Sequence, residues 1–133
     1  MKTAFSLMLF ATLSGCATGV GSSAAYSSNP VPVEIVTGGD DGLTQRLVDA
    51  VRGEFGKSSA FTFAPASATN ALIVTIPTHV GWNDVGKKTR VTYQLRLERA
   101  GRVLEESAGA CWEDQLRVCA ETIVNAAGRG MKL

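Results

Sequence analysis

The chain has 133 residues, of which 45% are hydrophobic and 19% are charged. These values fit one compact domain with a short appendage and exclude a second hydrophobic core. Thirteen Lys and Arg residues stand against twelve Asp and Glu residues, for a net charge of +1, so the sequence has no excess of positive charge for a nucleic-acid partner.

The first 15 residues have the anatomy of a secretory signal. Lys2 supplies a positive charge near the start, and residues 4–13 (AFSLMLFATL) form an apolar run. A membrane-spanning helix needs about 20 apolar residues, so this run is too short to remain as one. The sequence therefore predicts that the chain is exported and that residues 1–15 form a signal peptide that is removed.

The tetrapeptide at the expected cleavage point is Leu13-Ser14-Gly15-Cys16. It resembles the lipobox of bacterial lipoproteins, and this resemblance implies cleavage before Cys16 and a diacylglyceryl thioether on its Sγ. Several acyl chains would hold the protein permanently at a membrane. By similarity to the sorting rule of enterobacterial lipoproteins, Ala17 implies the outer membrane, with the domain facing the periplasm. The other interpretation is an ordinary signal peptide that is cut after Ala17, which would discard Cys16.

Residues 16–31 contain the lipidated cysteine and a stretch that is rich in Gly, Ser and Ala and lacks a hydrophobic period. Such a composition predicts a flexible tether. Fully extended, residues 17–31 would reach roughly 50 Å at about 3.3 Å per residue. The single folded domain is expected over residues 32–133.

The first half of this domain predicts three strands and a helix. Residues 33–37 (VEIVT) are rich in β-forming residues. Apolar residues recur at helical spacing over residues 43–55, which predicts an amphipathic helix. Residues 61–63 alternate as a short strand, and the nearly continuous apolar run at residues 71–76 (ALIVTI) predicts a central strand buried on both faces.

The second half begins with residues 77–88 (PTHVGWNDVGKK), whose turn-forming residues predict a loop. Apolar and polar side chains alternate over residues 89–98, which predicts a strand with one face in the core. A tight turn at residues 99–102 is expected to lead into a strand at residues 103–110. A second amphipathic helix is expected over about residues 113–127.

The predicted order of elements is β-α-β-β-β-β-α. We expect an α+β domain, a two-layer sandwich in which two helices cover one face of a four- to five-stranded mixed sheet. The lipobox, the tether and this topology together resemble small envelope lipoproteins, among them the LptE-like lipopolysaccharide-assembly lipoproteins and relatives of the TolB N-terminal domain. This resemblance implies an accessory role without naming a partner.

Two cysteines, Cys111 and Cys119, remain once Cys16 is lipidated. They form an even number in a compartment that permits disulfides. A bridge requires Cα atoms within about 7 Å, which is met if the last helix begins late enough for the chain before it to fold back. The alternative is that Cys119 packs as a small buried hydrophobe on the helix while Cys111 lies on the strand. The sequence favours the bridge and leaves both alternatives open.

Catalytic, cofactor-binding and metal-binding motifs are absent from the sequence. His79 has no Cys or acidic residue at ligand spacing and is expected to be a surface or packing residue. Helix capping accounts for Asp40 and Asp41 without a metal or an acid/base role. The sequence thus predicts a protein that is not an enzyme and needs no cofactor, and a hydrolase is the least favoured interpretation.

The candidate contact surface consists of Trp82, Lys87, Lys88 and Arg90. An aromatic residue flanked by cations is typical of a surface that binds a protein, a glycan strand or an anionic lipid head group. The alternative is that Trp82 folds back on the sheet edge and the cations are only solvated. We expect an accessory or assembly factor of an envelope complex, or alternatively a lipid- or glycan-binding periplasmic module with a ligand between helices and sheet.

Overall fold

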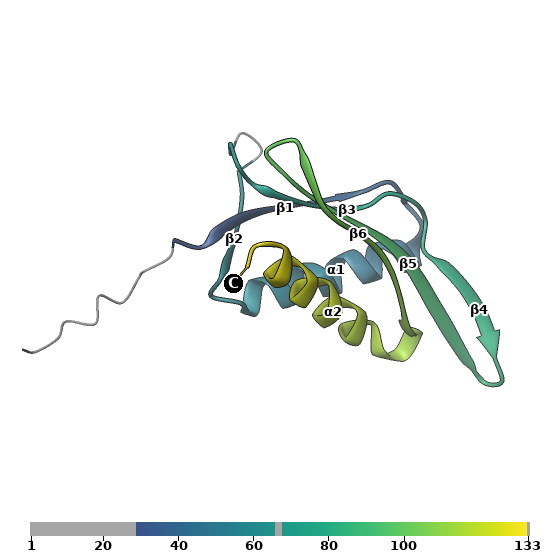
Figure 1. Cartoon of the computed structure of the whole chain (residues 1–133). Coiled ribbons are helices and arrows are strands. Elements are labelled where there is room, and N and C mark those ends of the chain that lie inside the picture. Colours follow the sequence, from purple (N-terminus) through teal and green to yellow (C-terminus); the bar gives the residue numbers. More distant parts are fainter. Residues whose placement is uncertain (1–28, 66–67, 133) are drawn as a thin grey trace, which may run out of the picture.

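The computed structural model describes residues 29–65 and 68–132. The predicted signal peptide, Cys16 and most of the predicted tether lie outside the described residues. Figure 1 shows a curved sheet with two helices on one of its faces. Within the described ranges, no helix combines the length and the apolar character that crossing a membrane requires.

The predicted α+β class is confirmed, because the structure contains a mixed six-stranded sheet and two helices that pack together. The sheet has one strand more than the upper limit of the prediction. In chain order the elements are β1 Val31–Thr37, α1 Gly42–Lys57, β2 Phe61–Phe63, β3 Leu72–Ile76, β4 Gly81–Val85, β5 Lys88–Arg99, β6 Arg102–Trp112, the 3-10 turn Glu113–Gln115 and α2 Leu116–Gly130.

The sheet is parallel at one side and antiparallel at the other. Strand β1 lies between β2 and β3 and runs parallel to both. Strand β3 also pairs antiparallel with β5, so the predicted central position of residues 71–76 is confirmed. The long strand β5 pairs with β3 through its last residues, with β4 through its first residues, and with β6 along nearly its whole length.

The core lies between the sheet and the two helices. The predicted alternation of β5 is confirmed, because Val91, Tyr93, Leu95 and Leu97 are buried while the residues between them are exposed or half-buried. The buried stripe of α1 consists of Thr44, Leu47, Val48, Val51 and Phe55, and that of α2 consists of Leu116, Cys119, Ala120, Ile123, Ala126 and Ala127. Each large apolar side chain buried in this way contributes about 1.5–3 kcal/mol.

The prediction of a loop over residues 77–88 is wrong for its second half, which forms β4. Gly81, Asn83 and Asp84 disfavour a strand by local propensity, but their pairing with β5 overrides that preference. The turn itself contains only Gly86 and Lys87, since Val85 pairs directly with Lys88. Gly86 takes a φ of 63°, a conformation that favours glycine in such a tight hairpin.

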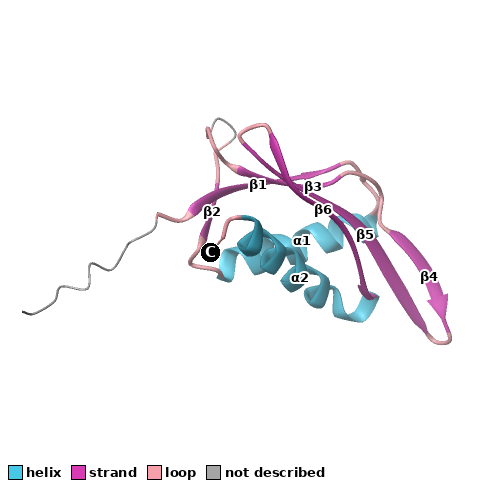
Figure 2. Ribbon diagram, in the orientation of Figure 1, coloured by secondary structure: helices cyan, strands magenta, loops and turns pink. Residues whose placement is uncertain are grey.

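A short interruption separates β3 from β4, and Figure 2 shows it as a loop between two strands on one side of β5. Thr75 pairs with Arg96 and Gly81 pairs with Thr92, so residues 76–80 lie opposite residues 93–95. The β3–β4 side therefore carries extra residues, as in a β-bulge. This segment is called the bulge below.

The disulfide is confirmed: Cys111 at the end of β6 is bonded to Cys119 in α2, with a Cα–Cα distance of 5.7 Å. The α-helix was predicted from about residue 113, but residues 113–115 form a 3-10 turn and α2 begins at Leu116. This later start folds the chain back over the helix and brings the two cysteines within reach of each other.

Candidate contact surface on the β4–β5 hairpin

Strand β4 is exposed along its whole length and on both of its faces. The Trp82 side chain is 64% exposed and that of Val85 is 49% exposed. Within the part of the chain that the structure describes, β4 pairs only with β5, so its other edge has unpaired backbone groups. Figure 1 shows that β4 and its turn extend past the helices at one end of the molecule. The predicted contact surface therefore lies on a projecting hairpin.

The hairpin does not bring all four predicted contact residues together. Directly opposite residues of an antiparallel pair share a face, and successive residues alternate. Trp82 pairs with the buried Val91, so it lies on the face that bears the helices. Lys88 and Arg90 alternate with Val91 and lie on the other face, while Lys87 is in the turn. The alternative that Trp82 folds back against the sheet is excluded by its exposure.

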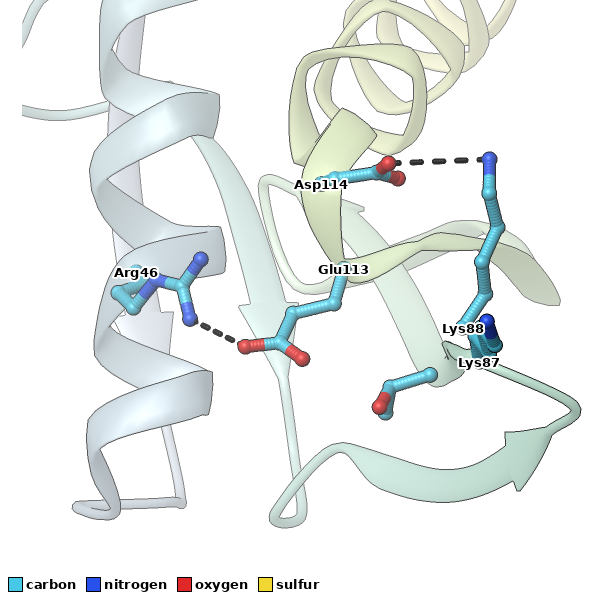
Figure 3. A pocket seen from close by; sticks show the side chains of 6 residues that line it. Arg46, Lys87, Lys88, Glu113 and Asp114 are labelled. Atoms are coloured by element: carbon cyan, nitrogen blue, oxygen red, sulfur yellow. Dashed lines mark hydrogen bonds and ion pairs between the residues drawn. The ribbon is translucent and has the colours of Figure 1, made fainter.

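Lys88 is held by the end of β6 and the 3-10 turn that follows it, a contact that has no signal in the sequence. Its Nζ lies 3.7 Å from Asp114 Oδ2 and 5.8 Å from the centre of the Trp112 ring. Nearby, Arg46 Nη1 of α1 lies 2.6 Å from Glu113 Oε1. Figure 3 shows both ion pairs around a surface hollow of about 250 Å³, lined by Arg46, Lys87, Lys88, Thr89, Glu113 and Asp114. Exposed pairs of this kind contribute little to stability, and with Lys87 the lining has one more cation than it has carboxylates.

Asp41 caps α1, which confirms its predicted role. The same residue positions the base of the hairpin through its contact with His79. Asp41 Oδ1 accepts hydrogen bonds from the backbone N–H groups of Leu43 and Thr44, at 3.1 and 2.9 Å. It is the N-cap of α1. Asp40 is different, because its side chain is fully exposed and approaches His79 Nε2 only to 3.9 Å.

Thr44 and His79 connect this cap to the bulge. The Thr44 hydroxyl is fully buried, donates to Asp41 Oδ2 at 2.5 Å and accepts from the backbone N–H of Val80 at 3.0 Å. His79 Nδ1 lies 2.5 Å from the same Asp41 Oδ2. Two consecutive bulge residues are thereby bound to the first turn of α1. We call Asp41, Thr44 and His79 the cap cluster.

Glycine allows the close approach that the cap cluster needs. A Cβ atom on Gly38 would lie 2.1 Å from the carbonyl oxygen of Pro77, and one on Gly39 would lie 3.0 Å from the Cα of His79. The segment before α1 and the bulge after β3 are therefore in direct contact. Neither this contact nor the Asp41–His79 pair has a sequence signal, because the partners are 38 positions apart.

The cap cluster also shifts the titration of its members. Hydrogen bonds from the Thr44 hydroxyl and backbone, and then from His79, hold the pKa of Asp41 well below its usual range. The hydrogen bond to Asp41 raises the pKa of His79, against a smaller effect of burial. His79 therefore favours its charged form beside a charged Asp41. The Asp41–His79 contact joins the helix cap to the bulge, and the prediction that His79 carries no chemistry stays a prediction.

The other hollows over the described residues lie at the surface. One, of about 370 Å³, is lined by residues that include Thr92, Gln94 and His79, and another, of about 350 Å³, adjoins it at Gln94 and Ala108. A smaller hollow of about 150 Å³ lies beside Phe55 and Phe63. No group of three His, Cys, Asp or Glu side chains within residues 29–65 and 68–132 is arranged to hold a metal ion. Comparison with family models, curated proteins and solved structures finds no match to this chain.

Proposed function

We propose that this protein is a non-enzymatic lipoprotein of the outer membrane, facing the periplasm, which serves as an accessory or assembly factor by binding an envelope protein through the β4–β5 hairpin. The lipid on Cys16 would supply the membrane attachment. The observation that carries the proposal is the exposure of all five residues of β4, a strand whose outer edge is unpaired among the described residues and which bears Trp82 at 64% exposure.

The physical reason is the cost of leaving such a strand uncovered. Trp is a frequent centre of binding energy at protein interfaces because it buries a large apolar area and also offers an N–H group. An unpaired edge can accept an extended segment of a partner through backbone hydrogen bonds. Proteins usually protect such edges with Pro, Lys or a covering element, and β4 (GWNDV) has neither Pro nor Lys.

The direction of the hairpin fits an anchored protein. The described chain enters the domain at β1, which begins at Val31, whereas β4 and its turn lie at the opposite end (Figure 1). A protein anchored ahead of Val31 would present the hairpin away from its attachment point. The Cys111–Cys119 disulfide supports an oxidising compartment such as the periplasm.

Site-specific photo-crosslinking in intact envelopes tests this proposal. A photoreactive amino acid replaces Trp82 in the full-length protein, and the control carries it at Val118, an apolar residue of α2 that is 44% exposed. We expect one protein partner to be crosslinked from position 82 and not from position 118, and Trp82→Ala to abolish co-purification of that partner. Equal crosslinking at both positions, or none at position 82, would contradict the proposal.

Glycan binding remains the alternative proposal, and one observation favours it. The two adjoining hollows on either side of Gln94 offer side-chain hydroxyl, amide and guanidinium groups, including those of Thr92 and Arg96. Such groups bind sugar hydroxyls through hydrogen bonds. Gln94→Ala would then abolish retention of the protein on cell-wall glycan strands, whereas Trp82→Ala would leave that retention unchanged.

A further inference from the structure

A second candidate surface lies at the end of the domain where the chain enters β1. A row of paired residues crosses the sheet there, from Val33 to Leu72, from Leu72 to Arg99 and from Arg99 to Arg102. Neighbouring strands are about 4.8 Å apart, so this row spans roughly 14 Å. Helix α2 also ends here, because its C-cap residue Met131 has its thioether sulfur, Sδ, 3.7 Å from Arg99 Nη1. We call this region the entry-end surface.

The entry-end surface carries uncompensated positive charge. Three carboxylates in this region have basic partners: Glu54 pairs with Lys57, Glu98 with Arg96, and Glu105 with Arg129. The exposed Glu34, in the same paired row as Glu98, has no basic partner among the described residues. Three further cations have no carboxylate partner among the described residues, namely Arg99, Arg102 and Lys132. Arg99 instead donates from Nε to the backbone carbonyl of Asn70, at 2.9 Å.

The hairpin end of the molecule has no such excess. Arg46, Lys88 and His79 are paired with Glu113, Asp114 and Asp41. Lys87 and Arg90 have no carboxylate partner among the described residues, but Asp84 has no basic partner there either. Asp40 approaches only His79, at 3.9 Å. At the end where the chain enters, the three unpaired cations outnumber the one unpaired carboxylate, Glu34, so positive charge is in excess there although the net charge of the described domain is balanced.

Exposed apolar side chains accompany these cations. Phe63 is 51% exposed at the end of β2, Val103 is 47% exposed and Leu104 is 37% exposed at the start of β6. The three residues lie on the outermost strands, β2 and β6, and so flank the row of paired residues. Cations beside exposed apolar residues are typical of surfaces that rest on lipid head groups.

We infer that the entry-end surface docks on an anionic phospholipid bilayer and thereby orients the domain with the hairpin pointing away from the membrane. This inference rests on the proposed lipid anchor, which would keep the surface within reach of the bilayer. Arg102, Arg99 and Lys132 attract the anionic head groups, and Phe63, Val103 and Leu104 enter the interfacial layer. The attraction weakens with salt, because the Debye length is about 10 Å at 0.1 M.

The test uses the full-length lipidated protein in nanodiscs of phosphatidylcholine, with or without phosphatidylglycerol. A gadolinium chelate on a lipid head group broadens the amide signals of residues close to the bilayer. We expect strong broadening at Phe63, Val103 and Leu104 in the anionic nanodiscs, weaker broadening in the neutral ones, and none at Gly86. Equal broadening at both ends, or none at either end in anionic nanodiscs, would overturn the inference.

Charge variants provide the matched control. The double variant Arg102→Gln with Lys132→Gln should lower the ratio of docked to free domain about 30-fold, since each Lys or Arg near an anionic surface contributes a factor of about five. Lys87→Gln with Arg90→Gln removes two cations from the hairpin end and should leave that ratio unchanged. Equal effects of the two variants would overturn the inference. A protein that stays in the membrane without docking contradicts only this inference, whereas an unlipidated Cys16 contradicts the proposed anchor.

Discussion

His79 lies with its Nδ1 2.5 Å from Oδ2 of Asp41, although 38 positions separate the two residues in the chain. The contact joins the residue that caps α1 to the bulge from which β4 begins. The same carboxylate oxygen accepts from Thr44, whose hydroxyl also binds the backbone of Val80. The first turn of a core helix and the base of the projecting hairpin are thus fixed to each other through one side chain.

The Asp41–His79 contact should make stability depend on pH. The pKa of His79 is raised in the folded protein, from a usual value of about 6.5. The charged form is therefore favoured by folding, and its contribution is fully present below about pH 6.5 and is lost as pH rises through the folded pKa. We expect the difference in free energy of unfolding between wild type and His79→Gln to be larger at pH 5.5 than at pH 8.5. Urea denaturation at both pH values measures it, and an equal difference at the two would refute the idea.

Asp41 should show the opposite dependence. Its folded pKa lies well below the usual range, so its contribution is present at neutral pH and is lost only as pH falls through the acid range. The Asp41→Asn variant should therefore lose stability relative to wild type at pH 7, and this deficit should shrink on acidification. Thermal unfolding followed by circular dichroism gives both values. Asp40→Asn is the control, because its side chain is fully exposed and caps no helix.

Replacement of Thr44 should be costly, because its buried hydroxyl both donates and accepts. Thr44→Val keeps the shape but leaves the N–H of Val80 without its partner. An unsatisfied buried group of this kind costs about 1–3 kcal/mol, measured as a lower free energy of unfolding in urea. Thr122→Val is the matched control, because the Thr122 hydroxyl is exposed and bonds only to the Val118 carbonyl within its own helix. Comparable losses in the two variants would contradict the assigned role.

The disulfide should stabilise the fold by constraining the unfolded chain. It closes a loop with a sequence separation of 8, for which the chain-entropy model gives about 2–3 kcal/mol. The double variant Cys111→Ala with Cys119→Ala should lose stability by about that amount. A reducing agent should destabilise wild type and have no effect on the variant. The prediction fails if reductant leaves the unfolding midpoint of wild type unchanged.

Replacement by alanine should change the free energy of unfolding in opposite directions at two glycines. Tyr93 pairs with Gly109 and covers it, so a Cβ at position 109 would meet the Tyr93 ring and hydroxyl, 2.3 Å away at the nearest atom. Gly109→Ala should therefore cost about 1–3 kcal/mol, since Tyr93 must move. Gly128 lies in α2 with nothing within 4 Å of an added Cβ, and Gly128→Ala should stabilise by about 0.5–1 kcal/mol. Denaturant titration of both variants checks the signs.

Periodicity alone was enough to predict the elements that bury a regular face. The alternation over residues 89–98 predicted β5, and the apolar stripe over residues 43–55 predicted α1. These patterns are local, because burial on one face of a strand or helix leaves its period in the sequence. The tight turn at residues 99–102 was also predicted, and Ala100 and Gly101 there both have positive φ.

Features that depend on pairing between distant residues were not predictable in this way. Strand β4 is exposed on both faces and so has no hydrophobic period, while Asn83 and Gly81 favour a turn. Because β4 was missed, the alternation that separates Trp82 from Lys88 and Arg90 was missed with it. The cap cluster depends on a bulge whose extra residues are visible only in the register of β3 and β4 against β5.

The unbroken course of β5 has a consequence for the energetics of recognition. Its second half lies in the core, and its first half supports β4 without a hinge between them. A partner that meets the hairpin would encounter a preorganised template and would not have to spend conformational entropy on ordering it. Association should therefore behave as a rigid-body encounter, with a rate set by diffusion and orientation and not by a preceding folding step.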